Sequence, residues 1–486
     1  MTSTLELLAE IVRWLEGLVF VVLQALALLS VPSVLLRRRS RPMAKLSWLL
    51  ALFAVPGIGV LAWWLIGRTH LLRKRRRRAA SEKAYAERCE KLPCTETGTS
   101  FDHLVPIRAL GRSIFTSVGN RVTLLINGEE AFPAMERAIR SAERSINLLF
   151  YIFKPDATGR RLRDLLVERA RAGVEVRVLV DAQGSSGFTS RFARPLLEGG
   201  AKVAWFLPSK FANLAKPRVN FVNHRKILVV DGAVAFTGGM NIGDEYALVW
   251  QDMMVQVEGG GVEALQHVFL EDWYFATEEL VEELMPLRPV RTSVPPPAPK
   301  GRVINDAACA VVASGPDSEA WIHDAYFAGL VQARKRIWIA TPYFIPSPSL
   351  LMALRTAANR GVDVRIVVPA TADVPLVTWA SRSFYLQLLE AEARIFEYQG
   401  EVLHAKAWLV DDKLSSVGTA NVDSRSFRLS FEVICLFLSD DLNRGLAKWY
   451  EGLVSNSREI TLKSMRDQST GQKLLESAAN LLSPLL

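Results

Sequence analysis

The chain opens with two long runs of apolar residues that carry no charge. Gly17 to Leu36 holds 20 uncharged residues, which is enough for roughly 30 Å of helix and therefore for crossing a bilayer. Leu46 to Gly67 is a second uncharged run with tryptophans near both ends, where indole rings favour the membrane interface. We predict two transmembrane helices, the second of them kinked near Pro56-Gly57.

A cleaved signal peptide is the competing interpretation of the first run. The residues before it include Glu6, Glu10 and Glu16 instead of a basic start, and no small-residue cleavage site follows. These features favour a retained anchor.

Basic clusters lie on both sides of the second run, and the two clusters predict opposite orientations for a helix that crosses the membrane. One cluster, Arg37 to Lys45, precedes the run, and a larger one, Arg68 to Arg78, follows it. Because basic residues tend to stay on the cytoplasmic side, the larger cluster predicts a cytoplasmic location for the rest of the chain. In the alternative, the second run dips into the membrane and returns, so that both clusters lie on one face.

After a polar stretch that we predict to be a linker, strand-like and helical patterns alternate from about Thr116, as in an α/β domain. The order recurs in the second half, where residues 360–365 (RGVDVR) echo residues 172–177 (AGVEVR). We therefore predict a duplication, with the Pro-rich stretch Pro289 to Pro299 as its connector. The predicted helices are 131–142, 159–172, 262–275, 318–333 and 348–359, and the predicted strands are 146–153, 174–181, 227–230, 337–344, 362–369 and 407–410.

These patterns divide the chain into five parts. Residues 1–80 form the membrane anchor, 81–116 the linker, 117–288 the first half, 289–300 the connector and 301–486 the second half with its tail. The tail from Asp441 is amphipathic enough to lie against the domain or against the membrane.

A matched pair of motifs lies in corresponding places of the two halves. Both read H-x-K-x4-D-x6-G-x-x-N and stand 180 positions apart. The apolar residues inside each motif predict a buried strand that leaves His and Lys on one face. The motif residues are His224, Lys226, Asp231 and Asn241 in the first copy and His404, Lys406, Asp411 and Asn421 in the second.

Two such strands meeting across a pseudo-dyad would gather two imidazoles and two ammonium groups around one pocket. This set suits a phosphodiester, because it offers a nucleophile, a proton donor for the leaving oxygen and cations for the phosphoryl charge. The lysines and asparagines would bind phosphoryl oxygens. Asp231 and Asp411 complete the motif, but they follow the strands and could simply brace them. The motif pair requires no metal or other cofactor.

The charge distribution favours a membrane partner over nucleic acid. Residues 1–80 hold 13 Lys and Arg against 3 Asp and Glu, which leaves 46 basic and 47 acidic residues, a net charge of −1, for the rest of the chain. A nucleic-acid-binding domain normally carries its own basic excess, whereas a basic segment beside apolar helices suits a bilayer surface.

The motif pair resembles the phospholipase D superfamily, and specifically its bacterial cardiolipin synthases. The positions 28 residues after each histidine, Asp252 and Glu432, match the family carboxylates that hold the catalytic imidazoles. The two copies differ mainly in Gly239 against Thr419 and in Asp252 against Glu432. Further phrases typical of the family are residues 238–246 (GGMNIGDEY), 314–317 (SGPD), 341–346 (TPYFIP) and 424–427 (SRSF).

The resemblance implies two phospholipase D-like α/β/α halves that pack side by side, with the active site at their shared face. It implies phosphatidyl transfer at a bacterial inner membrane. One phosphatidylglycerol gives its phosphatidyl group to the enzyme, and the hydroxyl of a second takes it to form cardiolipin. It further implies that His224 is the nucleophile and His404 the acid/base, while the sequence leaves open which carboxylate serves which histidine.

Three alternatives remain at this stage. A phospholipase D would use water as the acceptor, a nuclease is disfavoured by the charge distribution, and a non-catalytic membrane scaffold is disfavoured because every motif position is present in both copies. The sequence leaves the oligomeric state open, and also whether phosphatidylethanolamine can serve as the second substrate.

Overall fold

The computed structural model describes residues 2–36, 42–64, 114–207, 221–281, 302–316, 318, 320–372 and 374–483. They belong to two compact units, one with the N-terminal helices and one with the duplicated halves. The first basic cluster up to Arg41, the second basic cluster, the predicted linker up to residue 113, the Pro-rich connector and Asp317 lie outside the described residues.

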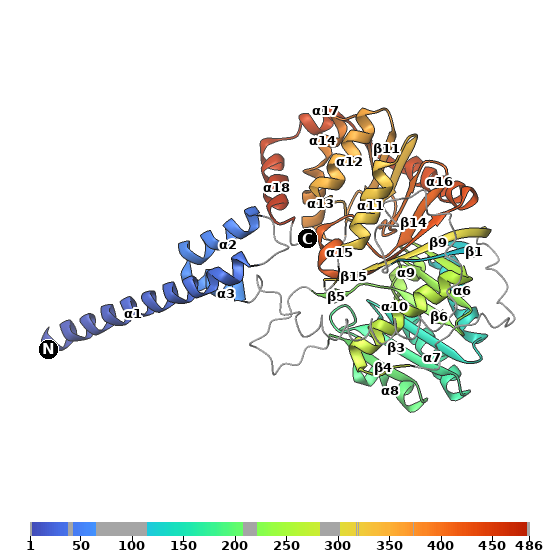
Figure 1. The fold of residues 1–486 in the computed structure, drawn as a ribbon, viewed down its shortest axis with the longest axis horizontal. Coiled ribbons are helices and arrows are strands. Elements are labelled where there is room, and N and C mark those ends of the chain that lie inside the picture. The colour runs from blue at the N-terminus through green and yellow to red at the C-terminus, as the bar shows by residue number, and fades with distance from the viewer. Residues whose placement is uncertain are drawn as a thin grey trace. The chain divides into compact units, whose positions relative to one another are not determined.

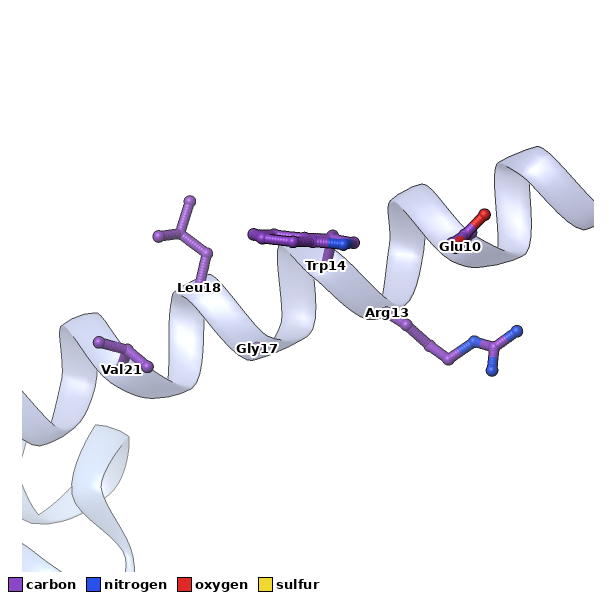
Figure 2. A pocket seen from close by; sticks show the side chains of 6 residues that line it. All are labelled: Glu10, Arg13, Trp14, Gly17, Leu18 and Val21. Carbon is purple, nitrogen blue, oxygen red and sulfur yellow. The ribbon is translucent and has the colours of Figure 1, made fainter.

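The first apolar run lies in one continuous helix, α1 (Thr2–Leu35). Its stretch Arg13–Leu35 is long and apolar enough to cross a membrane. Figure 2 shows the part of this helix where Glu10, Arg13, Trp14, Gly17, Leu18 and Val21 line one pocket. The last charge before the long apolar run is Glu16, and Trp14 stands two residues before it, near the end of the run where an indole ring favours the membrane interface.

In its described part, up to Trp64, the second apolar run forms no helix long enough to span a membrane, so the prediction of two transmembrane helices is not confirmed. It is divided into α2 (Pro42–Ala54) and α3 (Pro56–Ala62). Val55 between them has a non-helical backbone (φ −137°, ψ 73°), as expected for the residue before a proline. A Cβ on Gly59 would lie 2.0 Å from the Ala51 carbonyl oxygen, so α3 folds back tightly on α2.

Both ends of this helical hairpin lie near the C-terminal end of α1. At the start of α2, Lys45 Nζ donates to the Leu35 carbonyl oxygen (2.9 Å). After α3, Trp63 Nε1 donates to Ser33 Oγ (2.8 Å). The chain therefore moves away from that end of α1 along α2 and returns to it along α3.

The second unit is built on one continuous mixed sheet (Figure 1). Within the described residues its order is β16-β12-β11-β10-β13-β14-β15-β9-β1-β8-β7-β6-β2-β3-β4. The antiparallel pair β1 and β9 joins the halves at the centre, and the order outward from β1 repeats outward from β9. This arrangement confirms the predicted α/β duplication.

The elements of the two halves correspond along the chain. Those of the first half are β1 (Ile114–Ile126), α6 (Asn127–Arg140), β2 (Ser145–Phe150), α7 (Ala157–Arg171), β3 (Glu175–Asp181), α8 (Ser190–Glu198), β4 (Lys202–Phe206), β5 (Val222–Asn223), β6 (Ile227–Val230), β7 (Val234–Gly238), α9 (Asp244–Leu248), β8 (Met253–Glu258) and α10 (Gly260–Thr277). Those of the second are β9 (Arg302–Ser314), α11 (Trp321–Val331), β10 (Arg336–Ala340), α12 (Pro348–Asn359), β11 (Asp363–Pro369), α13 (Pro375–Arg382), α14 (Tyr385–Leu389), β12 (Arg394–Tyr398), β13 (Ala407–Val410), β14 (Leu414–Gly418), α15 (Ser424–Arg428), β15 (Ser430–Leu438), α16 (Asp440–Ser455), β16 (Ser457–Ile460), α17 (Leu462–Arg466) and α18 (Thr470–Leu481).

Helices cover both faces of the sheet, so that its central strands are apolar on both sides. Helices α10 and α16 share one core with strands from both halves. On the opposite face, α6, α7 and α8 pack over the first half, and α11, α12 and α14 over the second. Each segment predicted from periodicity overlaps an observed element. Residues 114–116, at the end of the predicted linker, already belong to β1, and the tail adds β16 to the sheet edge beside β12.

Candidate active site at the junction of the halves

Each motif histidine is held beside a strand of the other half. His224 N donates to the Phe431 carbonyl oxygen (2.9 Å), and His404 N donates to the Gln251 carbonyl oxygen (2.7 Å). The short strand β5 before His224 also pairs in parallel with β15. The residues that follow Phe431 and Gln251 are Glu432 and Asp252, so each histidine is placed next to the carboxylate of the opposite half.

The side chains complete this crossed arrangement. His224 Nδ1 lies 3.0 Å from Glu432 Oε1, and His404 Nδ1 lies 2.7 Å from Asp252 Oδ2. A carboxylate on Nδ1 fixes the tautomer and leaves Nε2 for chemistry. The pairing that the sequence left open is thus His224 with Glu432 and His404 with Asp252.

The two lysines are buried beside their histidines. Lys226 Nζ donates to the His224 carbonyl oxygen (2.7 Å), and Lys406 Nζ lies 2.9 Å from His404 Nε2. Burial lowers the pKa of Lys226 well below its usual range, with Glu432 acting in the opposite direction. These ammonium groups are poorly hydrated, so an entering phosphoryl group would be a strong partner for them.

The two imidazoles have different electrostatic surroundings. Burial, followed by the charges of Lys226 and Lys406, lowers the pKa of His224 well below its usual range. Burial and Lys406 also lower the pKa of His404, but the Asp252 carboxylate opposes them. His224 is therefore favoured as the neutral base, while His404 has the better counter-ion for an added proton.

The carboxylates differ in the same sense. Burial raises the pKa of Glu432 to about 7, although Lys226 and Thr419 act to lower it. Burial would also raise the pKa of Asp252, but the charge and hydrogen bond of His404 outweigh it and hold that pKa below its usual range.

The glycine and threonine that distinguish the copies explain how both carboxylates fit. A Cβ on Gly239 would lie 2.1 Å from Asp252 Oδ1, so no larger residue fits beside this carboxylate as it stands. In the other copy, the Thr419 hydroxyl donates to Glu432 Oε2. The shorter acid is accommodated by glycine, and the longer one is hydrogen-bonded by threonine.

The remaining motif residues hold the surrounding backbone. Asn241 Oδ1 accepts from Ile152 N (3.1 Å), whereas Asn421 Oδ1 is buried and has no hydrogen-bond partner in the described part of the chain. Asp231 and Asp411 follow β6 and β13, at the opposite ends of these strands from the histidines. Their carboxylates accept from backbone amides of residues 143–145 and 334–336, respectively, as expected for residues that brace the neighbouring strand.

Several neighbouring residues were not found from the sequence. Aromatic rings pack on both imidazoles, Tyr151 on His224 (centroids 4.8 Å apart) and Trp250 on His404 (5.2 Å). Trp250 was visible beside Asp252, but Tyr151 carries no motif. Arg225 stands between the first His and Lys, where the second copy has Ala405, and this difference was the available signal.

Arg225 is fully buried and joins the halves. Its Nη1 donates to Asp272 Oδ2 in α10 (2.7 Å), and its Nε donates to the Glu432 carbonyl oxygen (3.1 Å). This ion pair therefore supports the residue that orients His224. Among the described residues, no group of three or more His, Cys, Asp or Glu side chains is arranged to hold a metal ion.

Comparisons with known proteins agree with this geometry. The family model described as cardiolipin synthase, PLD-like domain matches residues 135–273 and 326–454, and the phospholipase D-nuclease N-terminal model matches residues 22–68. The chain is 36% identical to cardiolipin synthase 1 of Bacillus anthracis, over 96% of this chain and 93% of that protein. It is 35% identical to the major cardiolipin synthase ClsA of Bacillus subtilis (strain 168), over 93% and 96% respectively.

A solved structure shows the same fold at low sequence identity. Phosphatidylserine synthase from Haemophilus influenzae Rd KW20 superimposes with a TM-score of 0.59 and 16% identity, covering 75% of this chain and 95% of that one. Together with the two motifs and their crossed carboxylates, the family model and the near full-length relatives show that this chain belongs to the cardiolipin synthase family of phospholipase D-like enzymes.

Proposed function

We propose that this enzyme transfers a phosphatidyl group between two phosphatidylglycerol molecules, forming cardiolipin and releasing glycerol. The observation that carries the proposal is the crossed pairing of His224 with Glu432 and His404 with Asp252. It holds two imidazoles by their Nδ1 atoms beside two buried lysines, in a chain similar to cardiolipin synthases over nearly its whole length.

In the first step, His224 Nε2 attacks phosphorus and forms a phosphohistidine. The bond from phosphorus to the glycerol oxygen breaks, and His404 gives its proton to that oxygen. In the second step, a hydroxyl of the next phosphatidylglycerol attacks phosphorus and His404 takes its proton. The phosphorus–nitrogen bond breaks, which restores both histidines, and the two lysines offset the phosphoryl charge throughout.

The assignment of roles rests on the asymmetry of the site. The nucleophile must be neutral, and burial beside two lysines favours a neutral His224. The acid must hold a proton, and the ionised Asp252 favours this on His404. The first-copy histidine is thus the nucleophile, as the family resemblance implies.

Lipid analysis of the purified enzyme tests the reaction. Supplied with phosphatidylglycerol alone, it should produce cardiolipin and free glycerol in equal amounts, without CDP-diacylglycerol and in the presence of a chelator. Release of phosphatidic acid as the main product would instead identify a phospholipase D. Adding phosphatidylethanolamine then shows whether a second headgroup is accepted.

Trapping the intermediate tests the division of labour. With a donor whose leaving group needs little protonation, His404→Ala should accumulate labelled phosphatidyl-enzyme and His224→Ala should carry none. Label in the His224 variant would reverse the roles. Absence of label from both variants and from wild type would exclude covalent catalysis.

We also propose that the N-terminal unit crosses the membrane once and that its second apolar segment re-enters the same face. Support comes from the hairpin of α2 and α3, whose two ends both contact the C-terminal end of α1. This arrangement puts both basic sequence clusters on one side of the bilayer, so both clusters predict the same orientation under the positive-inside rule. That side is then cytoplasmic, as is the body of the enzyme.

Labelling Ser40→Cys in sealed vesicles distinguishes the two topologies. With Cys89 and Cys94 replaced by serine, this thiol between the apolar segments should react only from the cytoplasmic side. A tag before Thr2 should be reached only from outside. Reaction of Ser40→Cys from outside would instead support two crossings.

A further inference from the structure

Helix α18 buries a carboxylate and exposes leucines, the reverse of what is usual for a helix on a water-exposed surface. It buries Glu476 and Ala479, which are 4% and 3% exposed. Its leucines point outward, with Leu474 66%, Leu475 42% and Leu481 82% exposed, followed by Leu482 at 43%. Surface helices normally bury the aliphatic stripe and expose the carboxylate, so this face is built to meet something apolar.

The orientation of α18 is fixed by buried ionic contacts. Glu476 Oε1 accepts from Arg382 Nε in α13 (3.1 Å) and from Gln468 Nε2 (3.0 Å). Arg382 also pairs with Glu397 of β12, which is itself buried. Turning the leucines inward would separate Glu476 from both Arg382 and Gln468.

Helix α18 lies at the active-site end of the second half, where Figure 1 shows it beside α13. Ala479 packs with Val377 and Ala380 of α13 and with Ile345. Ile345 N in turn donates to the Val422 carbonyl oxygen (2.7 Å), next to Asn421 of the motif. The helix that carries the outward leucines therefore packs against α13 and Ile345, and Ile345 contacts the residue next to Asn421.

Exposed cations accompany this leucine face. Lys463 and Arg466 of α17 and Lys473 of α18 are all exposed. Lys473 Nζ donates to the Arg466 carbonyl oxygen (2.7 Å), and the Arg466 guanidinium pairs with Glu390. Basic side chains beside an aliphatic face match the anionic headgroups and acyl region at a bilayer surface. A soluble partner would not require this combination, whereas a bilayer of phosphatidylglycerol supplies both components.

We propose that α18 inserts its leucine face, Leu474, Leu475, Leu481 and Leu482, into the surface of the phospholipid bilayer that holds the substrate. This contact is additional to the N-terminal anchor. It turns the active-site end of the second half toward the lipid and shortens the path of a phospholipid from the bilayer to the histidines.

Activity on two forms of the same lipid tests the proposal with the full-length enzyme. The double variant Leu474→Ser/Leu481→Ser should lose at least ten-fold activity on vesicles of long-chain phosphatidylglycerol, because losing the burial of even one leucine side chain already corresponds to about a ten-fold effect. Its activity on monomeric dihexanoyl phosphatidylglycerol in detergent should match wild type. Leu197→Ser, which replaces a 49% exposed leucine on α8, is the control and should behave as wild type on both.

Direct contact with lipid is measured by quenching. An environment-sensitive fluorophore on Leu481→Cys, with Cys89 and Cys94 replaced by serine, should be quenched by phospholipids that carry a nitroxide on the acyl chain. The same label on Leu197→Cys should not be quenched. A Leu481 label that is unquenched in nanodiscs overturns the proposal, whether the face is covered by a second copy, by the N-terminal helices or by nothing. Unchanged vesicle activity of the double variant overturns it as well.

Discussion

At the scale of single residues, the near-symmetric site is made unequal by two pairs of side chains. The Asp252 carboxylate occupies the space that a side chain at position 239 would need. The Glu432 carboxylate instead accepts a hydrogen bond from the Thr419 hydroxyl. The pKa of Asp252 is held below its usual range while burial raises that of Glu432 to about 7, so the two histidines have unequal carboxylate partners. In the proposed mechanism, this difference allows one imidazole to attack while the other carries the proton.

Replacing Gly239 should disable the acid/base side of the site. In Gly239→Ala the new methyl group must displace the Asp252 carboxylate, and His404 loses its partner. We expect turnover to fall about 100-fold, the cost of a displacement near 1 Å, while the melting temperature changes little. Gly452→Ala, in α16 with open space around the added carbon, should retain full activity. Equal activity of both variants would contradict the steric account.

Removing the Thr419 hydroxyl should move the pH profile upward. Its hydrogen bond favours the ionised form of Glu432, so in Thr419→Val the pKa of Glu432 rises above its value of about 7. If ionised Glu432 is needed to orient His224, the acid limb of the rate profile should shift by roughly one pH unit to higher pH. Thr237→Val is the control, since that buried hydroxyl has no hydrogen-bond partner in the described structure. A shift of the acid limb toward lower pH would contradict the view that the Thr419 hydroxyl stabilises ionised Glu432.

At this scale, the sequence predicted the site residues that occur in both copies of the motif. Identical spacing in two copies identified the histidines, lysines and asparagines without any structure. The assignment of Glu432 to His224 was out of reach, because it depends on β5 pairing with a strand more than 200 positions away. Tyr151 was missed for a related reason, since the second half has no counterpart that would have drawn attention to it.

At the scale of elements, periodicity predicted the strands and helices of the body well. The strands 227–230 and 407–410 and the helix 348–359 coincide with the observed elements. The prediction of one kinked helix for the second apolar run is not confirmed. Composition alone cannot distinguish a kink from a reversal, and the reversal depends on how Gly59 packs against Ala51.

The buried Arg225–Asp272 pair should be essential for stability. Arg225→Met removes the cation that pairs with the buried Asp272 carboxylate, and we expect a loss of roughly 3–5 kcal/mol, measured as a lower melting temperature in detergent. Arg225→Met/Asp272→Leu should recover much of that stability. Its turnover should stay low, because the Glu432 carbonyl has lost its donor.

An exposed ion pair provides the comparison for this experiment. Arg394 pairs with Glu459 at side-chain exposures of 45% and 43%, so Arg394→Met should cost less than about 1 kcal/mol. Full turnover in the stabilised double variant would show that Arg225 does not position Glu432.

At the scale of the whole molecule, the two halves share one sheet and exchange their carboxylates. The sheet is continuous because β1 of the first half pairs with β9 of the second. The carboxylates are exchanged because each half supplies the partner of the other half's histidine. Neither half alone holds an imidazole with its own Nδ1 partner. The catalytic unit is therefore the complete duplicated body.

Co-expressed inactive variants should fail to rescue each other. A His224→Ala chain and a His404→Ala chain each retain one histidine, and a working pair could form only if the halves were exchanged between chains. That exchange would require the β1–β9 pairing within each chain to open, so we expect no cardiolipin above the level of either variant alone. Lipid extracts of cells that express both tagged chains measure this. Restored synthesis would show that halves from two chains can assemble.

The crossed carboxylates also govern when activity begins during biosynthesis. Translation proceeds from the N-terminus, and the first half can start to fold before the second has been made. His224 is then already present but lacks Glu432, which is synthesised 208 residues later. In the proposed mechanism, a nascent chain, or a fragment cut off by premature termination, lacks the carboxylate that orients its nucleophile. We therefore expect such a chain to leave the lipids of the surrounding membrane intact until the second half has been made.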